Sequence, residues 1–312
     1  MRFALLLPIA SRHLVAALAV LSASTLALAC GDASPEGSSS GGSSTSSGGG
    51  SSGGSSSGGS STSSSGASGS GSSSSGGADG GVAKLTPGSS TLSITAAGKT
   101  RTVNLVVPTS VSAGKVPLVL ALHGNGDSAS NFVKTSGLAA YAETKGYVLA
   151  APQGISQSFT YQGQPVNGVD WDAYRTRGDG NIDLALLDAL KQKLVASGSI
   201  DEKRVMVYGY SQGGYLSFHY GIVGSAETSC AAVLAAASPL GTSFVQQATR
   251  KIPFALQIGA NDGAAAAARQ SRDALQGKGH PVQYDEIPGA PHVPIPGDPK
   301  KPLDYCMMQV LP

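Results

Sequence analysis

Residues 37–77 most strongly limit what this chain can fold into. Of these 41 positions, 38 are Gly or Ser, and the exceptions are Thr45, Thr62 and Ala67. Such a segment has almost no apolar surface to bury, so it cannot offset the entropy cost of becoming ordered. The 230 residues from 83 to 312 are enough for one domain with a sizeable core. We therefore expect a disordered Gly/Ser-rich linker over residues 31–82 and a single folded domain over residues 83–312.

The first 30 residues have the layout of an export signal. Arg2 and Arg12 supply positive charge, and an uncharged run rich in Leu and Ala extends from Leu14 to Ala29. A run of this length is short for a membrane span but suits the apolar region of a signal peptide. It ends at Cys30, directly after a small residue, which is similar to the lipobox of bacterial lipoproteins. We expect an exported protein, with lipidation of Cys30 and a cell-surface or periplasmic location. Ordinary signal cleavage near Ala29, giving an extracellular protein, is the alternative.

The charge of the chain is nearly balanced once its parts are separated. From residue 81 onward there are 19 Lys and Arg against 16 Asp and Glu. The basic side chains form no run, and no basic patch with interleaved aromatic residues is present. The sequence therefore gives no support for a nucleic-acid partner.

The chain has three cysteines, Cys30, Cys230 and Cys306. If Cys30 carries lipid, an exported domain retains two, and a Cys230–Cys306 disulfide is expected, with two buried free thiols as the alternative. No pair of cysteines has metal-ligand spacing. Asp179–Asp183 opens like a calcium-binding loop, but the later glycine and glutamate of such a loop are missing, so we interpret the segment as the cap of a helix. We expect no metal and no other cofactor.

Apolar runs alternate with helical patterns along the predicted domain. The expected strands are Ser90–Ala96, Thr102–Val107, Pro117–Leu122, Tyr147–Ala151, Arg204–Tyr208, Ala231–Ala236, Phe254–Ile258 and Val282–Ile287. The expected helices are Ser130–Lys145, Asn181–Ala196, Gln212–Val223, Ala264–Gly277 and Lys301–Val310. Several strands are continuous apolar runs, as central strands of a parallel sheet require. An early antiparallel hairpin followed by strand–helix alternation indicates a three-layer α/β fold with a mostly parallel sheet.

Ser211 is the candidate nucleophile. It lies in Gly209-Tyr210-Ser211-Gln212-Gly213, a match to G-x-S-x-G, between an expected strand and an expected helix. The pattern alone is weak, but it needs this strand–turn–helix setting, in which the serine hydroxyl stands exposed at the start of the helix. The sequence therefore predicts nucleophilic catalysis by Ser211, which requires a base, a group that orients the base, and donors for an oxyanion.

His292 and Asp262 are the candidate base and acid. His292 follows the last expected strand, and Asp262 follows the strand before it. Loops at the carboxyl ends of parallel strands meet at one edge of the sheet, so these side chains are expected to lie near Ser211. The resulting order Ser…Asp…His is that of α/β-hydrolases. The less suitable candidates for the base are His123, His219 and His280, and those for the acid are Asp285, Glu286 and Asp298.

Two backbone amides are expected to bind the oxyanion. One is that of Gln212, directly after the nucleophile, and the other comes from the loop after the strand that ends at Leu122. In that loop we favour the amide of Asn125, with that of Gly124 as the second choice. His123 is expected to shape the loop.

Together these residues resemble the α/β-hydrolase superfamily. More narrowly, residues 85–312 look like the secreted group that contains polyhydroxybutyrate depolymerases, feruloyl esterases and acetylxylan esterases. The resemblance rests on His123-Gly124, Asn131-Phe132, Ala151–Gly154, Val169–Trp171, Asn181–Asp183, Gly209–Gly214 and Gly289–His292. Pro294 stands where that group commonly has Trp, and we find no separate substrate-binding module. The resemblance therefore implies a hydrolase of soluble esters rather than of a crystalline polymer.

The expected activity is that of a serine carboxylic ester hydrolase acting on feruloyl, acetylxylan or hydroxyalkanoate-type esters through an acyl-enzyme. Trp171 and Tyr210 are candidates for lining its substrate pocket, and core packing is the alternative for both. A serine peptidase of the same fold and a non-catalytic surface binding module are the alternative functions. The expected partners are the ester substrate, free or linked to a polysaccharide, and a membrane through the lipid at Cys30.

Overall fold

The structure is a computed structural model that describes residues 83–293 and 297–312. The predicted signal segment, Cys30, the Gly/Ser-rich linker and Pro294 lie outside these residues. None of the helices in the described part of the chain combines the length and apolar character that a membrane span needs.

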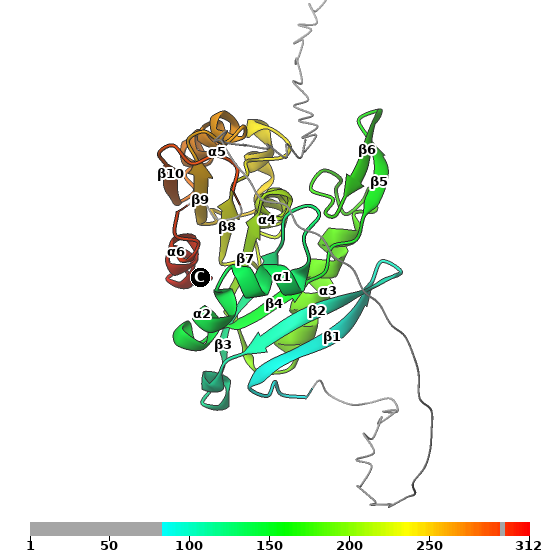
Figure 1. The fold of residues 1–312 in the computed structure, drawn as a ribbon, viewed down its shortest axis with the longest axis vertical. Helices are drawn as coiled ribbons and strands as arrows, with labels where there is room; N and C mark the ends of the chain where they lie inside the picture. Colours follow the sequence, from blue (N-terminus) through cyan, green and yellow to red (C-terminus); the bar gives the residue numbers. More distant parts are fainter. Residues whose placement is uncertain (1–82, 294–296) are drawn as a thin grey trace, which may run out of the picture. The chain divides into compact units, whose positions relative to one another are not determined.

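An eight-stranded sheet in the order β1-β2-β4-β3-β7-β8-β9-β10 organises the domain (Figure 1). Its strands are β1 Gly88–Ala96, β2 Lys99–Val107, β3 Val116–Leu122, β4 Val148–Pro152, β7 Ile200–Tyr210, β8 Cys230–Leu234, β9 Phe254–Gly259 and β10 Val282–Ile287. β1 pairs with β2, and β2 with β4, in antiparallel register, whereas the pairs from β4 through β3 to β10 are parallel. All eight predicted strands are confirmed, as is the mostly parallel sheet with its early antiparallel hairpin.

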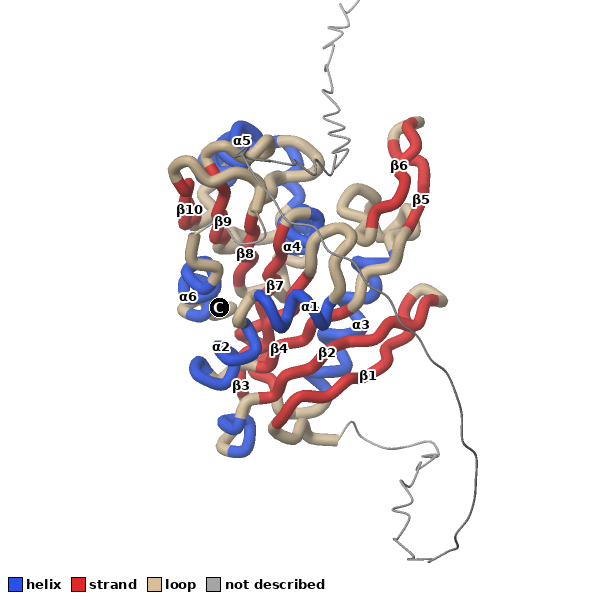
Figure 2. The backbone as a smooth tube through the Cα atoms, viewed as in Figure 1, coloured by secondary structure: helices blue, strands red, loops and turns tan. Residues whose placement is uncertain are grey.

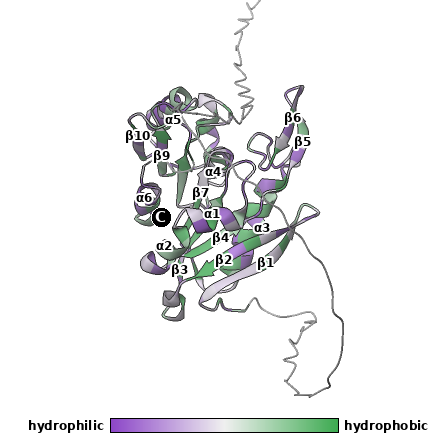
Figure 3. Cartoon of the chain, viewed as in Figure 1, coloured by the Kyte–Doolittle hydropathy of each residue, from purple (hydrophilic) through white to green (hydrophobic). Residues whose placement is uncertain are grey.

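Helices cover both faces of the sheet, which confirms the three-layer architecture (Figure 2). The helices are α1 Ala129–Thr135, α2 Leu138–Lys145, α3 Ile182–Ala196, α4 Gln212–Val223, α5 Ala265–Gly277 and α6 Lys300–Met307, with short 3₁₀ turns η1 Thr109–Ser112 and η2 Thr242–Gln247. Residues of α3 and α4 share one core cluster with the strands, and residues of α1, α2 and α6 share the other. Every residue of β3, β4, β8 and β9 is buried, because these strands have helices on both faces. In Figure 3 the strands labelled β4 and β9 are coloured mostly as hydrophobic.

One expectation about secondary structure was wrong, and one pair of strands was missed. The single helix predicted over 130–145 is two helices, because Gly137 has φ 70° and begins α2 in a left-handed conformation that breaks the first helix. A second, two-stranded sheet was missed: β5 Gln157–Tyr161 pairs with β6 Gln164–Val169. Its turn places both Gln162 and Gly163 at positive φ, as a tight hairpin requires, but its polar strands carry little hydrophobic signal.

A buried ion pair joins the first strands to α3. Arg101 Nη2 of β2 lies 2.6 Å from Asp183 Oδ1 in the first turn of α3, and both side chains are essentially inaccessible. Burial raises the pKa of Asp183 and the charge of Arg101 opposes that shift. The other carboxylate oxygen accepts hydrogen bonds from the Asp172 amide and the Gln157 side chain, each at 2.7 Å. The Asn181 side chain caps α3 by accepting from the amides of Asp183 and Leu184. The sequence predicted this cap in place of a calcium loop.

A disulfide attaches the C-terminal helix to the middle of the sheet. Cys230 of β8 is bonded to Cys306 of α6, and both residues are fully buried. The predicted pairing is thus confirmed, and the alternative of two free thiols is wrong. Hydrogen bonds support the same attachment: Tyr208 donates to the Pro299 carbonyl at 3.1 Å, and the Gln257 side chain donates to the Asp298 carbonyl at 3.0 Å.

Replacing both cysteines by Ala should lower the free energy of unfolding by about 4 kcal/mol, because the crosslink closes a long loop in the unfolded chain. The two half-cystines are 76 residues apart. Chemical denaturation of the oxidised wild type and the double variant measures this difference. Equal unfolding free energies would show that the crosslink contributes nothing to stability.

Breaking the buried pair by Arg101→Met should destabilise the domain by about 3–5 kcal/mol, because it leaves the Asp183 carboxylate buried without its cation. The matched control is Arg177→Met. Arg177 pairs with Asp188 at 2.7 Å, but both side chains are partly exposed, so this loss should cost about 1 kcal/mol or less. Thermal and denaturant unfolding of both variants test the contrast, and similar losses in the two would contradict it.

Candidate active site

Ser211 lies in a sharp turn between the end of β7 and the start of α4. Its φ of 53° and ψ of −119° are outside the regions that a non-glycine residue favours. The strained turn is held by the sheet, since the Ser211 amide donates to the Leu234 carbonyl of β8 at 2.9 Å. The backbone therefore presents the side chain of Ser211 at the carboxyl edge of the sheet, in the setting that the G-x-S-x-G pattern requires.

Two glycines make this turn sterically possible. A Cβ at Gly209 would overlap the carbonyl of Gly213, the second residue of α4, and a Cβ at Gly213 would come within 2.5 Å of the His123 carbonyl oxygen. The first helical turn after Ser211 therefore packs directly against the backbone of β7 and of the loop after β3. This close approach brings the loop at 123–127 beside Ser211.

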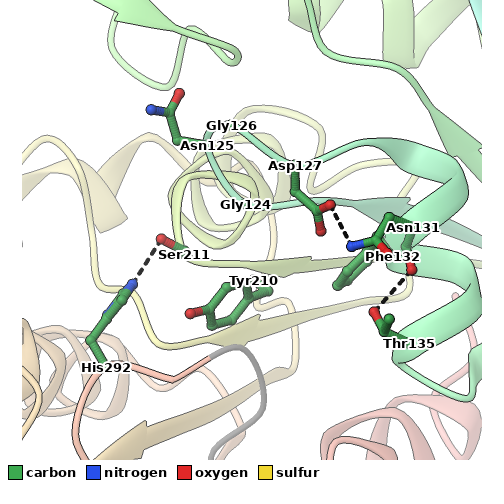
Figure 4. A pocket seen from close by; sticks show the side chains of 10 residues that line it. All are labelled: Gly124, Asn125, Gly126, Asp127, Asn131, Phe132, Thr135, Tyr210, Ser211 and His292. Atoms are coloured by element: carbon green, nitrogen blue, oxygen red, sulfur yellow. Dashed lines mark hydrogen bonds between the residues drawn. The ribbon is translucent and has the colours of Figure 1, made fainter. Parts of the chain in front are cut away.

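The structure brings the three predicted catalytic side chains into one hydrogen-bonded series. Ser211 Oγ lies 2.9 Å from His292 Nε2 (Figure 4). His292 Nδ1 lies 2.7 Å from Asp262 Oδ2. The other Asp262 oxygen accepts from the Ala264 amide at 2.8 Å. The Asp262 side chain is 2% exposed, whereas that of His292 is 45% exposed. Because a carboxylate accepts hydrogen bonds, Nδ1 carries the proton and Nε2 is free to accept the proton of Ser211.

The three other histidines of the described residues are buried and have partners other than Ser211. His123 Nδ1 donates to the Gly124 carbonyl at 2.8 Å and its Nε2 accepts from the Gly154 amide at 2.9 Å, so it shapes the loop, as predicted. Burial lowers the pKa of His219, which donates to the Ala173 carbonyl. Burial also lowers the pKa of His280, which hydrogen-bonds the Ile252 backbone.

The alternative acids have other partners. Asp285 pairs with Lys301 at 2.9 Å, and Glu286 pairs with Arg269 at 2.6 Å. Asp298 accepts from the Lys300 amide at the start of α6. Of the four candidate acids, Asp262 is therefore the one that contacts His292.

The geometry of the loop after β3 narrows the choice of oxyanion donors. The Asp127 amide closes a turn onto the Gly124 carbonyl at 3.2 Å, and the Gly126 amide donates to Asp170 Oδ2 at 2.6 Å. Asn125 comes directly before these two residues in the loop, and its side chain accepts from the Asp170 amide and points away from Ser211 (Figure 4). Gln212 begins α4, where first-turn amides have no partner one turn earlier. The Gln212 amide and, from the loop, the amides of Asn125 and Gly124 thus remain the candidates.

Trp171 does not line the pocket, so this part of the prediction was wrong. Its side chain is fully buried, and its indole nitrogen donates to the His123 carbonyl at 2.8 Å. It acts as a core residue beneath the loop because the buried Arg101–Asp183 pair holds the neighbouring backbone. The Gln212 side chain, which the sequence did not single out, accepts from the amides of both Asp170 and Trp171 at 2.8 and 3.0 Å.

A cavity of about 450 Å³ opens beside Ser211. Tyr210 lines it, as predicted, with its ring 5.6 Å from that of His292. Burial raises the pKa of the Tyr210 hydroxyl to about 12, which keeps that group neutral. Four lining side chains were not predicted as pocket residues: Asp127, Asn131, Phe132 and Thr135 (Figure 4). They come from the loop after β3 and from α1. The four-residue spacing of Asp127, Asn131 and Thr135 is the signal that could have found the three polar ones.

Within the described residues, no group of three or more His, Cys, Asp or Glu side chains has the arrangement of a metal site. The chemistry available here is that of a serine hydroxyl, a neutral imidazole, a buried carboxylate and backbone amides. Such a set can carry an acyl group on Ser211 and stabilise the negative charge that forms on its carbonyl oxygen.

The sheet order, the turn at Ser211 and the Ser–His–Asp series together define an α/β-hydrolase. Comparison with known families agrees. The family described as Phospholipase/Carboxylesterase matches residues 106–274, which is more than half of the chain. The chain therefore belongs to the phospholipase/carboxylesterase family of the α/β-hydrolase superfamily.

Three individual proteins that this chain resembles share 14–29% sequence identity with it. NocK of Nocardia uniformis subsp. tsuyamanensis, a protein named as an esterase, is 29% identical over 127 residues, which are 40% of this chain and 34% of NocK. A thermostable esterase of known structure superimposes with a TM-score of 0.57 at 20% identity, over 71% of this chain and 63% of the other. This chain thus spans less than two thirds of either protein. The CE1 ferulic acid esterase AmCE1/Fae1A of Anaeromyces mucronatus was solved with ferulic acid. It superimposes with a TM-score of 0.56 at 14% identity, over 72% of this chain and 90% of the other. These structural matches show the α/β-hydrolase fold.

Gly213→Ala should reduce activity by about 100-fold or more, because the added methyl group would push α4 away from the loop after β3 and displace an oxyanion donor. The matched control is Gly114→Ala, since a Cβ at Gly114 meets no atom within 4 Å and its φ is not in the left-handed region. Steady-state kinetics with a p-nitrophenyl ester and far-UV circular dichroism of both variants make the test. Unchanged activity in Gly213→Ala would contradict the close approach described above.

Proposed function

We propose that this protein is a serine carboxylic ester hydrolase that works through an acyl-enzyme. The observation that carries the proposal is the hydrogen-bonded series from Ser211 through His292 to Asp262 at the mouth of a cavity. Membership of the phospholipase/carboxylesterase family supports the same reaction class.

The first half-reaction starts at Ser211. His292 Nε2 accepts the hydroxyl proton while Ser211 Oγ attacks the ester carbonyl carbon. Asp262 holds Nδ1 and stabilises the imidazolium that forms. The amides of Gln212 and Asn125 bind the oxyanion, and α4 adds the positive end of its dipole there. His292 then gives its proton to the departing alkoxide, and the acyl group stays on Ser211.

The second half-reaction uses water in place of the serine. His292 accepts a proton from a water molecule, whose oxygen attacks the acyl carbon. The tetrahedral intermediate is held by the same amides, and its collapse releases the carboxylic acid as His292 returns the proton to Ser211 Oγ. The exposed position of His292 supports this role, because solvent can reach its edge.

Soluble feruloyl, acetylxylan and hydroxyalkanoate-type esters are the proposed substrates. The resemblance of the sequence motifs to that group supports this class, and AmCE1/Fae1A, which shares the fold, was solved with ferulic acid. The protein is proposed to be exported and tethered by lipid at Cys30. The N-terminal pattern supports export, and the Cys230–Cys306 disulfide supports it too, since disulfides persist in oxidising compartments.

The test compares wild type with Ser211→Ala on methyl ferulate, acetylated xylan, 3-hydroxybutyrate oligomers, short p-nitrophenyl esters and aminoacyl anilides. Wild type should hydrolyse esters, and the variant should lose about 10⁴-fold or more in kcat/KM because no other group can form the acyl-enzyme. Ser158→Ala, at an exposed position of β5, is the matched control and should retain activity.

Two results would refute the proposal. Faster turnover of the anilides than of the esters would identify a serine peptidase. If Ser211→Ala left every measured activity unchanged, the protein would be a non-catalytic binding module on a hydrolase fold.

A further inference from the structure

We infer that Asp127 makes the cavity beside Ser211 select against acyl groups that end in a negative charge. The inference concerns the same site and rests on the proposed ester hydrolysis. The polar end of the cavity would receive the distal end of the acyl chain, which is uncharged or positively charged in a good substrate. Asp127 is the residue that sets this preference.

The position of Asp127 is set by the start of α1. One carboxylate oxygen accepts from the Ser128 amide at 2.7 Å and from the Asn131 side chain at 2.8 Å. Asn131 is in turn followed by Thr135, whose hydroxyl donates to the Asn131 carbonyl at 2.9 Å. These three residues form one row along the cavity wall (Figure 4). The carboxylate is thus held in place, and its second oxygen is left for a ligand.

Among the described residues, Asp127 forms no ion pair. Both donors to it are neutral groups, and the described residues that line the cavity include no Lys or Arg. A second carboxylate, that of Asp170, binds the Gly126 amide from the same loop. A concave site lined by one sign of charge repels ligands of that sign and attracts the opposite sign.

The positions of the reacting groups assign this end of the cavity to the acyl side. His292 must protonate the departing alkoxide, so the alcohol part of the ester lies toward His292. Figure 4 shows Asp127, Asn131 and Thr135 on the opposite side of Ser211 from His292. The acyl chain therefore extends toward Asp127 in the cavity that Tyr210 and Phe132 also line, and its distal group meets the carboxylate.

A hydroxyl, an amide N–H or a cationic group at that position can donate to or attract the free oxygen of Asp127. A distal carboxylate instead brings two negative charges together in a partly enclosed site, where Coulomb repulsion is stronger than in bulk water. We expect a penalty in kcat/KM of about tenfold or more for such a substrate.

The experiment uses three 4-nitrophenyl esters of six-carbon acyl chains that differ in their distal group: carboxylate, carboxamide or trimethylammonium. For wild type, kcat/KM should be at least about tenfold lower for the carboxylate than for the carboxamide, and highest for the trimethylammonium ester. High salt should shrink the difference, because screening weakens the interaction between charges. These wild-type comparisons need no variant.

Asp127→Asn tests the residue itself. An asparagine carbonyl can still accept from the Ser128 amide and from Asn131, so the start of α1 is preserved, and thermal unfolding checks this. The carboxylate-to-carboxamide ratio of kcat/KM should rise by about fivefold or more, and the preference for trimethylammonium should fall. Asp273→Asn removes an exposed carboxylate of α5, next to Arg272, and should leave both ratios at their wild-type values.

The outcomes separate this inference from the proposed function. If wild type hydrolyses the three esters at equal rates in a Ser211-dependent way, or if Asp127→Asn leaves the ratios unchanged, the charge selection is wrong and the esterase stands. If none of the esters is hydrolysed in a Ser211-dependent way, the proposed function fails and the inference fails with it.

Discussion

Backbone packing between the first turn of α4 and the ends of β3 and β7 is the constraint on which the candidate site depends. Side chains at Gly209 or Gly213 would occupy the space that carbonyl groups of neighbouring elements fill. Their absence lets α4 begin directly above the sheet, with Ser211 in its strained turn. It also brings the loop at 123–127 beside Ser211, where we propose that a second amide joins that of Gln212 in binding the oxyanion. The same contact between backbones thus positions the nucleophile and supports the proposed oxyanion donors.

His292 is positioned by a second set of contacts, between the loops that follow β9 and β10. The Asn261 amide donates to the Ala290 carbonyl at 2.9 Å, and the side chain of Asn261 donates to the Gly289 carbonyl at 3.2 Å. The chain beyond His292 is held where Gln257 and Tyr208 bind the carbonyls of Asp298 and Pro299. The disulfide then joins α6 to β8. The segment that carries His292 is thus anchored on both sides, although the residue itself is partly exposed.

Much of the fold was predictable because its signal is local. The short, mainly apolar runs that became β3, β4, β8 and β9 indicate strands with helices on both faces. The hairpin of β5 and β6 was missed because its half-buried strands contain Gln, Ser, Thr and Asn, which give no clear period. The break between α1 and α2 was visible as Gly137, but a lone glycine inside a helical pattern does not by itself show whether the chain turns there.

The sequence by itself determined the strand–turn–helix at Ser211, the chain order Ser…Asp…His and the residues able to form a disulfide, because each depends on residue type and on position after a strand. The tertiary structure alone decided which side chains face the substrate. Trp171 and Asp127 both lie in loops at the carboxyl edge of the sheet, yet Trp171 is buried beneath the loop while Asp127 lines the cavity. That outcome depends on the buried Arg101–Asp183 pair and on the cap of α1. Both are contacts between segments whose packing the sequence pattern does not specify.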